Sequence, residues 1–286
     1  MTVFVLITAL LLIVLSVAKP LVYKPIAQKY DFGFSAALMA YWIVGFVLLT
    51  LPFMWEKIAD AISDFRKEPL FLVLTLFKGV LAWYAVKFGQ IVNKDSTSSS
   101  QFFPFISLAL ASLMLNVFFG ENLKHIHLFS IVALGILGLF FCSTGDTARM
   151  SKKWKINFMI AILFSAACPI ADHICIRQVG WYPYFVFSNM FMLIIACMRK
   201  TFVQDLKVAF TTKDTIRAGF FIMLLEVTII SSCVTVMPVS LVNFFRRLAA
   251  PIVMVVSAVR FKERTVKKQL IFGVLALLFA LPIIFG

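Results

Sequence analysis

The sequence predicts an all-α membrane protein with ten transmembrane helices, arranged as two inverted five-helix repeats. Three observations carry this prediction. Of the 286 residues, 62% are hydrophobic and only 14% are charged, which is far from the composition of a soluble domain. Apolar runs of about 20 residues, the length that spans a bilayer as a helix, recur along the whole chain. A membrane β-barrel would instead show a strict alternation of apolar and polar residues, which this chain lacks.

Polar and charged segments separate the apolar runs. They define ten predicted spans, at residues 2–18, 33–54, 69–91, 96–119, 125–143, 156–176, 182–198, 216–236, 238–259 and 268–285. The two longest connections, 55–69 and 199–217, have some helical periodicity and are expected to lie along the membrane interface. The first run has no basic segment before it and no clear cleavage site after it, so we interpret it as a retained helix rather than a signal peptide.

The two halves of the chain resemble one another. A shift of 142 residues places QFFPF (101–105) on NFFRR (243–247), and a shift of 149 places SVAKP (16–20) on SAACP (165–169). The predicted organisation is a first repeat at 1–143, a connecting loop at 144–155 and a second repeat at 156–286. An odd number of spans in each repeat turns the second copy upside down. Transporters with this plan place the substrate site near the membrane midplane, between the halves.

Two segments carry a family resemblance. The stretch SSSQFFPFISLALASLMLNVFFGENLKHIHLFSIVALGILGLFF (98–141) has a polar helix start, a proline, a long apolar run, Gly-Glu and a Gly-rich helix, and APIVMVVSAVRFKERTVKKQLIFGVLALLFALPIIFG (250–286) resembles a second copy. The pattern resembles the EamA-like branch of the drug/metabolite transporter superfamily. That resemblance implies ten helices, inverted repeats, a central cavity and alternating access. It also makes Glu121 and Glu263 helix-end acids of an architectural kind. Pro251 lies twelve residues before Glu263, whereas Pro104 lies seventeen before Glu121, which departs from that spacing.

The chain is strongly basic, with a formal net charge of +14. In a soluble protein this charge would suggest nucleic acid, but beside membrane helices it indicates contact with anionic lipid, and no nucleic-acid partner is expected. One set of loops carries 18 Lys and Arg residues and the opposite set carries 5. The positive-inside rule then places both termini outside the cytoplasm, whereas the family resemblance implies termini inside.

Charged residues inside predicted spans are the first candidates for a functional site, because such residues are costly in a bilayer. Arg246 and Arg247 lie near the middle of an apolar run, and Ser240, Asn243 and Arg247 form a polar stripe at helical spacing. A guanidinium can grip a carboxylate or phosphate of a substrate. The alternative is a structural ion pair or snorkelling. Adjacent helical residues point about 100° apart, so we expect one arginine, Arg247, to face the site.

The acidic candidates are Glu226 and Asp172. Glu226 can carry a coupling proton, or it can neutralise Lys78, Arg246 or Arg247. Asp172 and His173 follow Pro169, a proline that can break its helix, and His173 can shuttle a proton near neutral pH. The alternative is a satisfied polar cluster at a helix end.

The remaining substrate-site candidates are Lys78, Trp83, Tyr84 and Gln101. Lys78 is deep in its span and is expected to face the interior, while Trp83 and Tyr84 on the same helix can stack on a substrate or simply pack. Gln101 and the serines before it can cap the fourth span or line the pore.

These features favour a secondary active transporter for a small organic metabolite with an anionic group, such as an amino acid. The first alternative is a transporter of organic cations through an acidic and aromatic site. The second is an integral membrane lipid-modifying enzyme, for which the few acids are too scattered, so no enzymatic activity is expected. The sequence has no ATP-binding motif and implies no cofactor or metal. We expect a monomer or homodimer in the lipid bilayer of a bacterial inner membrane, with possible proton or ion coupling.

Overall fold

The computed structural model describes residues 2–119, 124–143, 150–237, 239–262 and 266–285. All regular structure in this part of the chain is helical. The helices, in chain order, are α1 (Thr2–Lys29), α2 (Phe32–Lys67), α3 (Pro69–Asp95), α4 (Thr97–Ser100), α5 (Phe103–Phe119), α6 (His125–Ser143), α8 (Lys152–Val179), α9 (Trp181–Cys197), α10 (Phe202–Thr211), α11 (Lys213–Thr235), α12 (Val239–Phe261) and α13 (Val266–Phe285).

Most of these helices are long enough and apolar enough to cross a bilayer. Eight pass on length and composition, and the pair α9 and α10, bent by 116°, can supply a ninth crossing. Within α13, Leu270–Phe285 forms a shorter apolar helix. In hydrocarbon a helix satisfies its own backbone polar groups, which explains why an apolar chain folds entirely as helices. The all-α membrane class is confirmed, and the number of ten spans stays a prediction.

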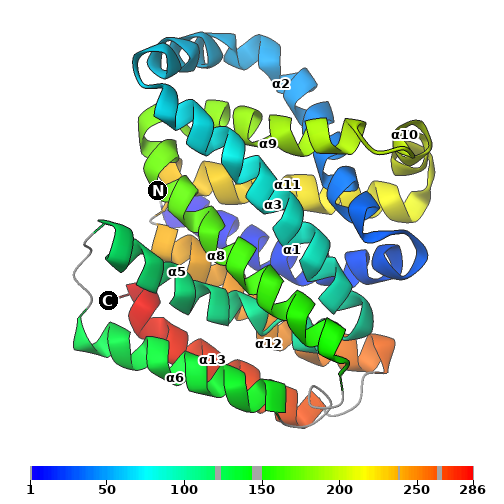
Figure 1. Cartoon of the computed structure of the whole chain (residues 1–286), viewed down its shortest axis with the longest axis vertical. Coiled ribbons are helices and arrows are strands. Elements are labelled where there is room, and N and C mark those ends of the chain that lie inside the picture. Colours follow the sequence, from blue (N-terminus) through cyan, green and yellow to red (C-terminus); the bar gives the residue numbers. More distant parts are fainter. Residues whose placement is uncertain (1, 120–123, 144–149, 238, 263–265, 286) are drawn as a thin grey trace.

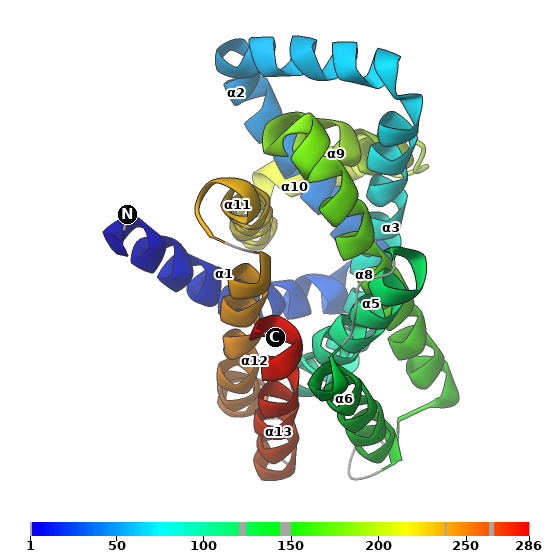
Figure 2. The ribbon, with the colours of Figure 1, turned by 90° about the vertical axis from the view of Figure 1, so that its left-hand side faces the viewer.

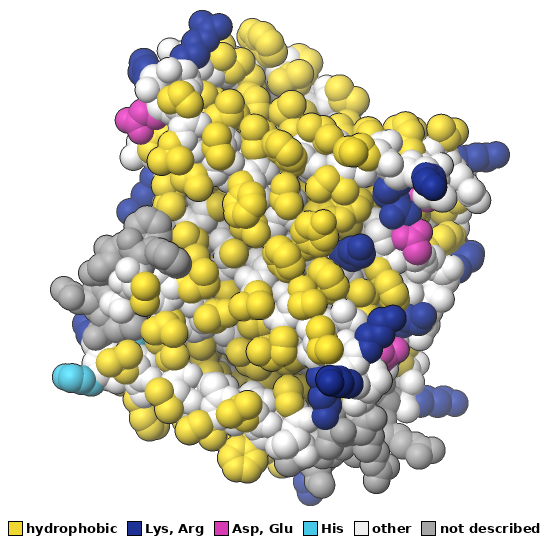
Figure 3. All heavy atoms as spheres, in the orientation of Figure 1, with side chains coloured by type: hydrophobic (Ala, Val, Ile, Leu, Met, Phe, Trp, Pro, Cys, Tyr) yellow, Lys and Arg dark blue, Asp and Glu magenta, His cyan; other side chains and the backbone are white. Residues whose placement is uncertain are grey.

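The outer surface is apolar, as lipid contact requires. Large side chains such as Leu49, Phe53, Leu139 and Val259 are more than two-thirds exposed on the described chain: 76%, 87%, 73% and 79%. In the space-filling view, hydrophobic atoms cover the middle of the molecule, and many basic side chains gather along the right-hand edge (Figure 3). The α1–α2 turn and α10 lie at that same edge (Figure 1). The molecule therefore has an apolar belt and one strongly basic end.

Helices from the two halves of the chain pack against each other in pairs. α3 packs on α8 and α1 on α11, while α1 also packs on α12 and α5 on α8. α2 packs on α9, and α6 on α13. Seen along the bundle, α1 and α11 lie on one side and α3 and α8 on the other (Figure 2). The first half is therefore no separate body, because most of its helices contact helices of the second half.

Several element boundaries differ from those predicted. α1 continues to Lys29 through Pro20 and Pro25, so it is eleven residues longer than the predicted span 2–18. α8 also continues past Pro169 to Val179, so this proline does not break its helix as the sequence suggested. The segment 55–67, predicted as a connection with helical periodicity, is the second part of the 36-residue helix α2.

Local sequence explains where the connections turn. The Asp31 side chain caps α2 by accepting a hydrogen bond from the Phe34 N–H at 3.0 Å, and Ser151 caps α8 in the same way. Gly180 joins α8 to α9 with a φ of +84°, a backbone conformation that favours glycine. Gly79 is needed for a different reason. A Cβ at this position would lie 2.0 Å from the Ser188 carbonyl oxygen, so α3 and α9 touch backbone to backbone there.

Candidate functional site

Six charged side chains from five helices interact inside the membrane-spanning bundle. We call this set the charged cluster, and its members are Lys19 of α1, Lys78 of α3, Asp172 of α8, Glu226 of α11, and Arg246 and Arg247 of α12. Two ion pairs hold its carboxylates. The charges of Lys78 and Arg246 also act on Glu226, which links the two pairs into one electrostatic unit.

The first ion pair joins α3 to α8. The Lys78 ammonium lies 3.8 Å from Asp172 Oδ1, and only 7% of Lys78 is exposed. The Tyr184 hydroxyl of α9 donates a hydrogen bond to the same carboxylate oxygen, and the Lys78 ammonium lies 5.5 Å from the Tyr184 ring centroid. The close approach of Gly79 to Ser188, one turn beyond Tyr184, brings these groups together. Tyr184 therefore fixes the position of Asp172 against Lys78.

The second ion pair joins α1 to α11. The Lys19 ammonium lies 3.4 Å from Glu226 Oε1, with 26% and 16% of the two side chains exposed. Lys19 directly precedes Pro20, whose carbonyl accepts a hydrogen bond from the Asn93 side chain at 3.1 Å. This contact ties α1 to α3 beside the ion pair.

Among the described residues, the hydrogen bonds of Arg247 go only to backbone carbonyls. Its Nη2 donates to the Pro104 carbonyl at 2.9 Å and its Nη1 to the Asn243 carbonyl at 3.3 Å. Only 9% of Arg247 is exposed, and its Nε has no hydrogen-bond partner within the described structure. A buried donor without an acceptor is costly, and a carbonyl dipole does not neutralise a full charge. Arg247 therefore has both spare charge and a spare donor.

Arg246 is half-buried on the same helix. Among the residues that the structure describes, no hydrogen bond or ion pair engages its guanidinium. Its charge acts on Glu226, Lys78 and Arg247, which places it in the same electrostatic unit. Both arginines therefore contribute positive charge to the cluster, and the expectation that Arg247 is the one that faces a substrate stays a prediction.

Three other residues predicted for the substrate site make packing contacts or local hydrogen bonds instead. Trp83 is 4% exposed and belongs to the main hydrophobic core. Tyr84 stacks on Phe164 of α8, with ring centroids 5.1 Å apart. The Gln101 side chain donates to the Thr97 carbonyl at 3.3 Å and to the Ser100 hydroxyl at 3.1 Å, so it closes the serine-rich turn of α4. Among the described residues, no hydrogen bond or ion pair joins these three side chains to the charged cluster.

Some predicted residues cannot be placed in the site. The side chains of His173 and Ser240 lie outside the described residues, although both positions are helical. Glu121 and Glu263 also fall outside them. Asn243 enters the site through its carbonyl, which accepts from Arg247.

Sequence reasoning missed Lys19 and Tyr184. Lys19 follows the predicted end of the first span, so it was counted among the loop cations, whereas α1 continues for another ten residues. The match of SVAKP with SAACP contained a signal, because it places Lys19 on Cys168, whose electrostatic neighbours include Lys78 and Asp172. Tyr184 gave no comparable signal in an aromatic-rich helix start.

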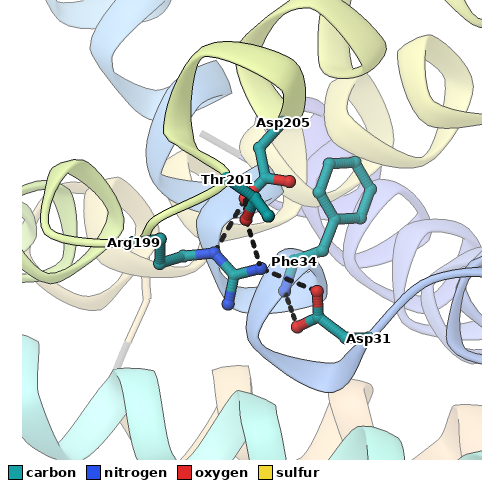
Figure 4. A network of polar contacts seen from close by, with 5 residues as sticks. All are labelled: Asp31, Phe34, Arg199, Thr201 and Asp205. Atoms are coloured by element: carbon teal, nitrogen blue, oxygen red, sulfur yellow. Dashed lines mark hydrogen bonds and ion pairs between the residues drawn. The ribbon is translucent and has the colours of Figure 1, made fainter.

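A second polar network lies outside the spans, at the basic end of the bundle. Arg199, between α9 and α10, donates from Nη2 to Asp31 at 2.7 Å and from Nε to Asp205 at 2.8 Å (Figure 4). The Thr201 hydroxyl also donates to Asp205, at 2.9 Å. Gly33 makes room for this arginine, since a Cβ there would lie 1.9 Å from Nη1 of Arg199. We call these residues the Arg199 network.

The Arg199 network is electrostatically satisfied. Desolvation acts to raise the pKa of the Asp31 carboxyl, but the hydrogen bonds from Arg199 and from the Phe34 N–H outweigh it, so the pKa lies below its ordinary value. Desolvation likewise acts to lower the pKa of Arg199, and its hydrogen bonds to Asp31 and Asp205 raise it overall. The network joins the α1–α2 turn of the first half to α10 of the second half.

A small surface pocket of about 150 Å³ lies away from both networks. It is lined by residues of α2 and of the α8–α9 turn, namely Lys57, Asp60, Val179, Gly180, Trp181, Tyr182 and Pro183. One lysine and one aspartate in an otherwise mostly apolar rim give it little chemistry. The charged cluster is the better candidate for a functional site.

The fold and its apolar belt define this chain as an all-α, multi-pass integral membrane protein. No protein-family model matches the sequence, and no curated protein matches it. The function must therefore be argued from the charged cluster and from the way the helices surround it.

Proposed function

We propose that the protein is a secondary transporter for a small organic anion, and that the charged cluster is its substrate site. The observation that carries the proposal is an excess of positive charge inside the bundle. Lys78 and Lys19 each face a carboxylate. Within the described residues, Arg246 has no ion pair and Arg247 donates hydrogen bonds only to carbonyls. Charged groups in a bilayer are expensive, and their retention is best explained by a ligand that completes them.

The arrangement of the helices supports an alternating-access transporter. α3 packs on α8 as α11 packs on α1, and α5 packs on α8 as α12 packs on α1. These are corresponding pairs if α1 to α6 and α8 to α13 are two copies of one five-span unit. Such an internal duplication is the plan of many secondary transporters, with the substrate site between the copies.

The helices that the two ion pairs join also correspond under this duplication. Lys78 of α3 and Glu226 of α11 are 148 residues apart in the sequence. Each forms an ion pair with the first helix of the other half, which is α8 for Lys78 and α1 for Glu226. Lys19 of α1 pairs with Glu226, while Asp172 of α8 pairs with Lys78. The signs of the charges are reversed between the two pairs. This arrangement supports a substrate site between the two proposed repeats.

The alternative of a cation transporter finds less support. Such a site needs a carboxylate free to meet the substrate and aromatic walls around it. Asp172 and Glu226 each face a lysine, and Trp83 and Tyr84 are engaged in packing. The membrane-enzyme alternative needs acids or bases grouped for catalysis, and the paired arrangement of these carboxylates does not favour it.

The direct test is flux in proteoliposomes. The purified full-length chain is reconstituted and loaded with a panel of organic anions, organic cations and zwitterionic amino acids, and efflux is compared with empty liposomes. We expect saturable flux of at least one anion and none of the cations. Flux of an organic cation alone, or no flux of any compound by correctly folded protein, would overturn the proposal. Repeating the assay over a pH gradient then tests Glu226 and Asp172 as coupling residues.

A further inference from the structure

The charge balance of the cluster points to the charge of the substrate. Four of the six side chains are cationic and two are carboxylates, so the formal charge of the unit is +2. One ion pair accounts for Lys19 and Glu226, and another accounts for Lys78 and Asp172. The excess therefore falls on Arg246 and Arg247. A guanidinium does not lose its proton to relieve this excess, so the compensation must come from another group.

The two arginines are placed to share one ligand. They are adjacent on α12, and the charge of Arg246 acts on Arg247, so their guanidinium groups repel one another. Within the part of the chain that the structure describes, Nε of the buried Arg247 and the guanidinium of half-buried Arg246 have no hydrogen-bond acceptor. A ligand with one negative charge would leave one of the two arginines uncompensated. A ligand with two negative charges would neutralise both and accept hydrogen bonds from both.

We infer that the transported anion is a dianion, a small molecule with two negative charges at neutral pH, such as a dicarboxylate or a phosphate monoester. Arg246 and Arg247 together bind it, and the pair discriminates it from a monoanion. This inference rests on the proposed function, because it specifies the substrate of the same site. Both ligand classes share the chemistry that the two guanidinium groups recognise, and the test separates them.

The test compares matched dianions and monoanions. The purified full-length protein is placed in nanodiscs of zwitterionic lipid, which excludes anionic headgroups as competing ligands. The probes are succinate against monomethyl succinate, and methyl phosphate against dimethyl phosphate. The readout is the rise of the thermal unfolding midpoint with probe concentration, which yields an apparent Kd. We expect the dianion of one pair to bind about tenfold or more tightly than its monoanion, since each charged hydrogen bond contributes at this level.

The pair that responds identifies the class of dianion. If it is the phosphate pair, the affinity for methyl phosphate should rise as the pH is raised through about 6, where a phosphate monoester loses its second proton. Affinity for dimethyl phosphate, which has no such proton, should not follow that rise.

Substitutions then assign the preference to the two arginines. Arg246→Gln and Arg247→Gln should each weaken the dianion about tenfold or more and change the monoanion by less than about threefold. The control is Arg260→Gln, the same change at an exposed position of the same helix. It should leave both affinities unchanged.

The outcomes separate this inference from the proposed function. Equal affinity for dianion and monoanion in the wild-type protein overturns the inference, even if a variant does not fold, and leaves anion transport standing. The same conclusion follows if either arginine variant weakens both members of a pair equally. If no anion binds and an organic cation is transported instead, the proposed function falls together with the inference.

Discussion

The protein contains two arginine-centred networks, and they differ in how completely their charges are satisfied. In the Arg199 network one guanidinium lies between two carboxylates and donates to both, at 2.7 and 2.8 Å. In the charged cluster, among the described residues, Arg247 donates hydrogen bonds only to carbonyls and Arg246 has no ion pair. A completed network stabilises the fold, whereas an incomplete one in the membrane interior is kept at a cost to stability. On the proposed function, the difference separates an architectural contact from a site that a ligand completes.

The largest effect should follow from breaking the Arg199 network. Arg199→Gln leaves the buried Asp205 without its cation and detaches Asp31 from α10. We expect a loss of about 3 kcal/mol in the free energy of unfolding, at the low end for a buried ion pair because Asp31 is partly exposed. Lys200→Gln, at the exposed neighbouring position, is the control and should change little. Equal stability of the two variants, measured by thermal unfolding in detergent, would show that this network is not architectural.

The charged cluster should respond to the packing that assembles it. In Gly79→Ala the new Cβ would have to move away from the Ser188 carbonyl, which it would otherwise meet at 2.0 Å. Separating α3 from α9 should cost about 2 kcal/mol and draw Lys78 away from Tyr184. Gly45→Ala is the matched control, because a Cβ at that helical position meets nothing within 4 Å. Its stability should be unchanged or slightly higher. An equally stable Gly79→Ala would contradict the close contact.

The satisfied network also predicts a pH dependence. The folded-state pKa of Asp31 is lowered, so its contribution to stability is complete above the pKa of the unfolded chain, about 3.9. It is lost as the pH falls from there through the folded-state pKa. Asp31→Asn keeps an N-cap for α2 but removes the charge, and should cost about 1 kcal/mol at neutral pH. The unfolding midpoint of this variant should fall less steeply below about pH 4 than that of the wild type. Parallel acid profiles would argue against an Asp31 contribution.

The smallest change in stability is expected from the incomplete network. Arg246→Gln removes a charge that has no ion-pair partner within the described structure. The empty protein should therefore keep its stability or gain about 1 kcal/mol or less, opposite in sign to Arg199→Gln. The comparison is made on unfolding midpoints without any ligand. A large destabilisation would mean that Arg246 is structural, and the contrast between the networks would then disappear.

The sequence predicts the fold class well because composition and run length decide it. Runs such as residues 125–143 can only be satisfied as helices in lipid, and α6 has the predicted bounds. Boundaries beside prolines were less predictable. α1 and α8 continue through Pro20 and Pro169. Membrane helices tolerate proline because neighbouring helices and side chains can satisfy the backbone group that it frees, and the local sequence does not reveal those neighbours. The part of α2 beyond the predicted span 33–54 was indicated in the sequence only by helical periodicity.

The sequence predicts most of the charged residues of the cluster, but it does not predict which of them form ion pairs. The cost of a charge in the bilayer identifies Lys78, Asp172, Glu226 and the two arginines from the sequence alone. The partner of each charge depends on which helices pack together, and that is set by contacts such as Gly79 against Ser188, which no spacing rule reveals. Lys19 was missed for a different reason, because it follows the predicted end of the first span, whereas α1 continues to Lys29.

The central claim is that the charged cluster binds the transported anion. It is tested most directly by uptake into proteoliposomes of the anion with the highest flux, with wild-type protein, Arg246→Gln and Arg260→Gln reconstituted in equal amounts. Arg246 and Arg260 both lie on α12, but of these two only Arg246 belongs to the cluster. The account predicts that Arg246→Gln keeps about a tenth or less of the wild-type rate at subsaturating substrate, while Arg260→Gln keeps the full rate. Undiminished uptake by Arg246→Gln would contradict it.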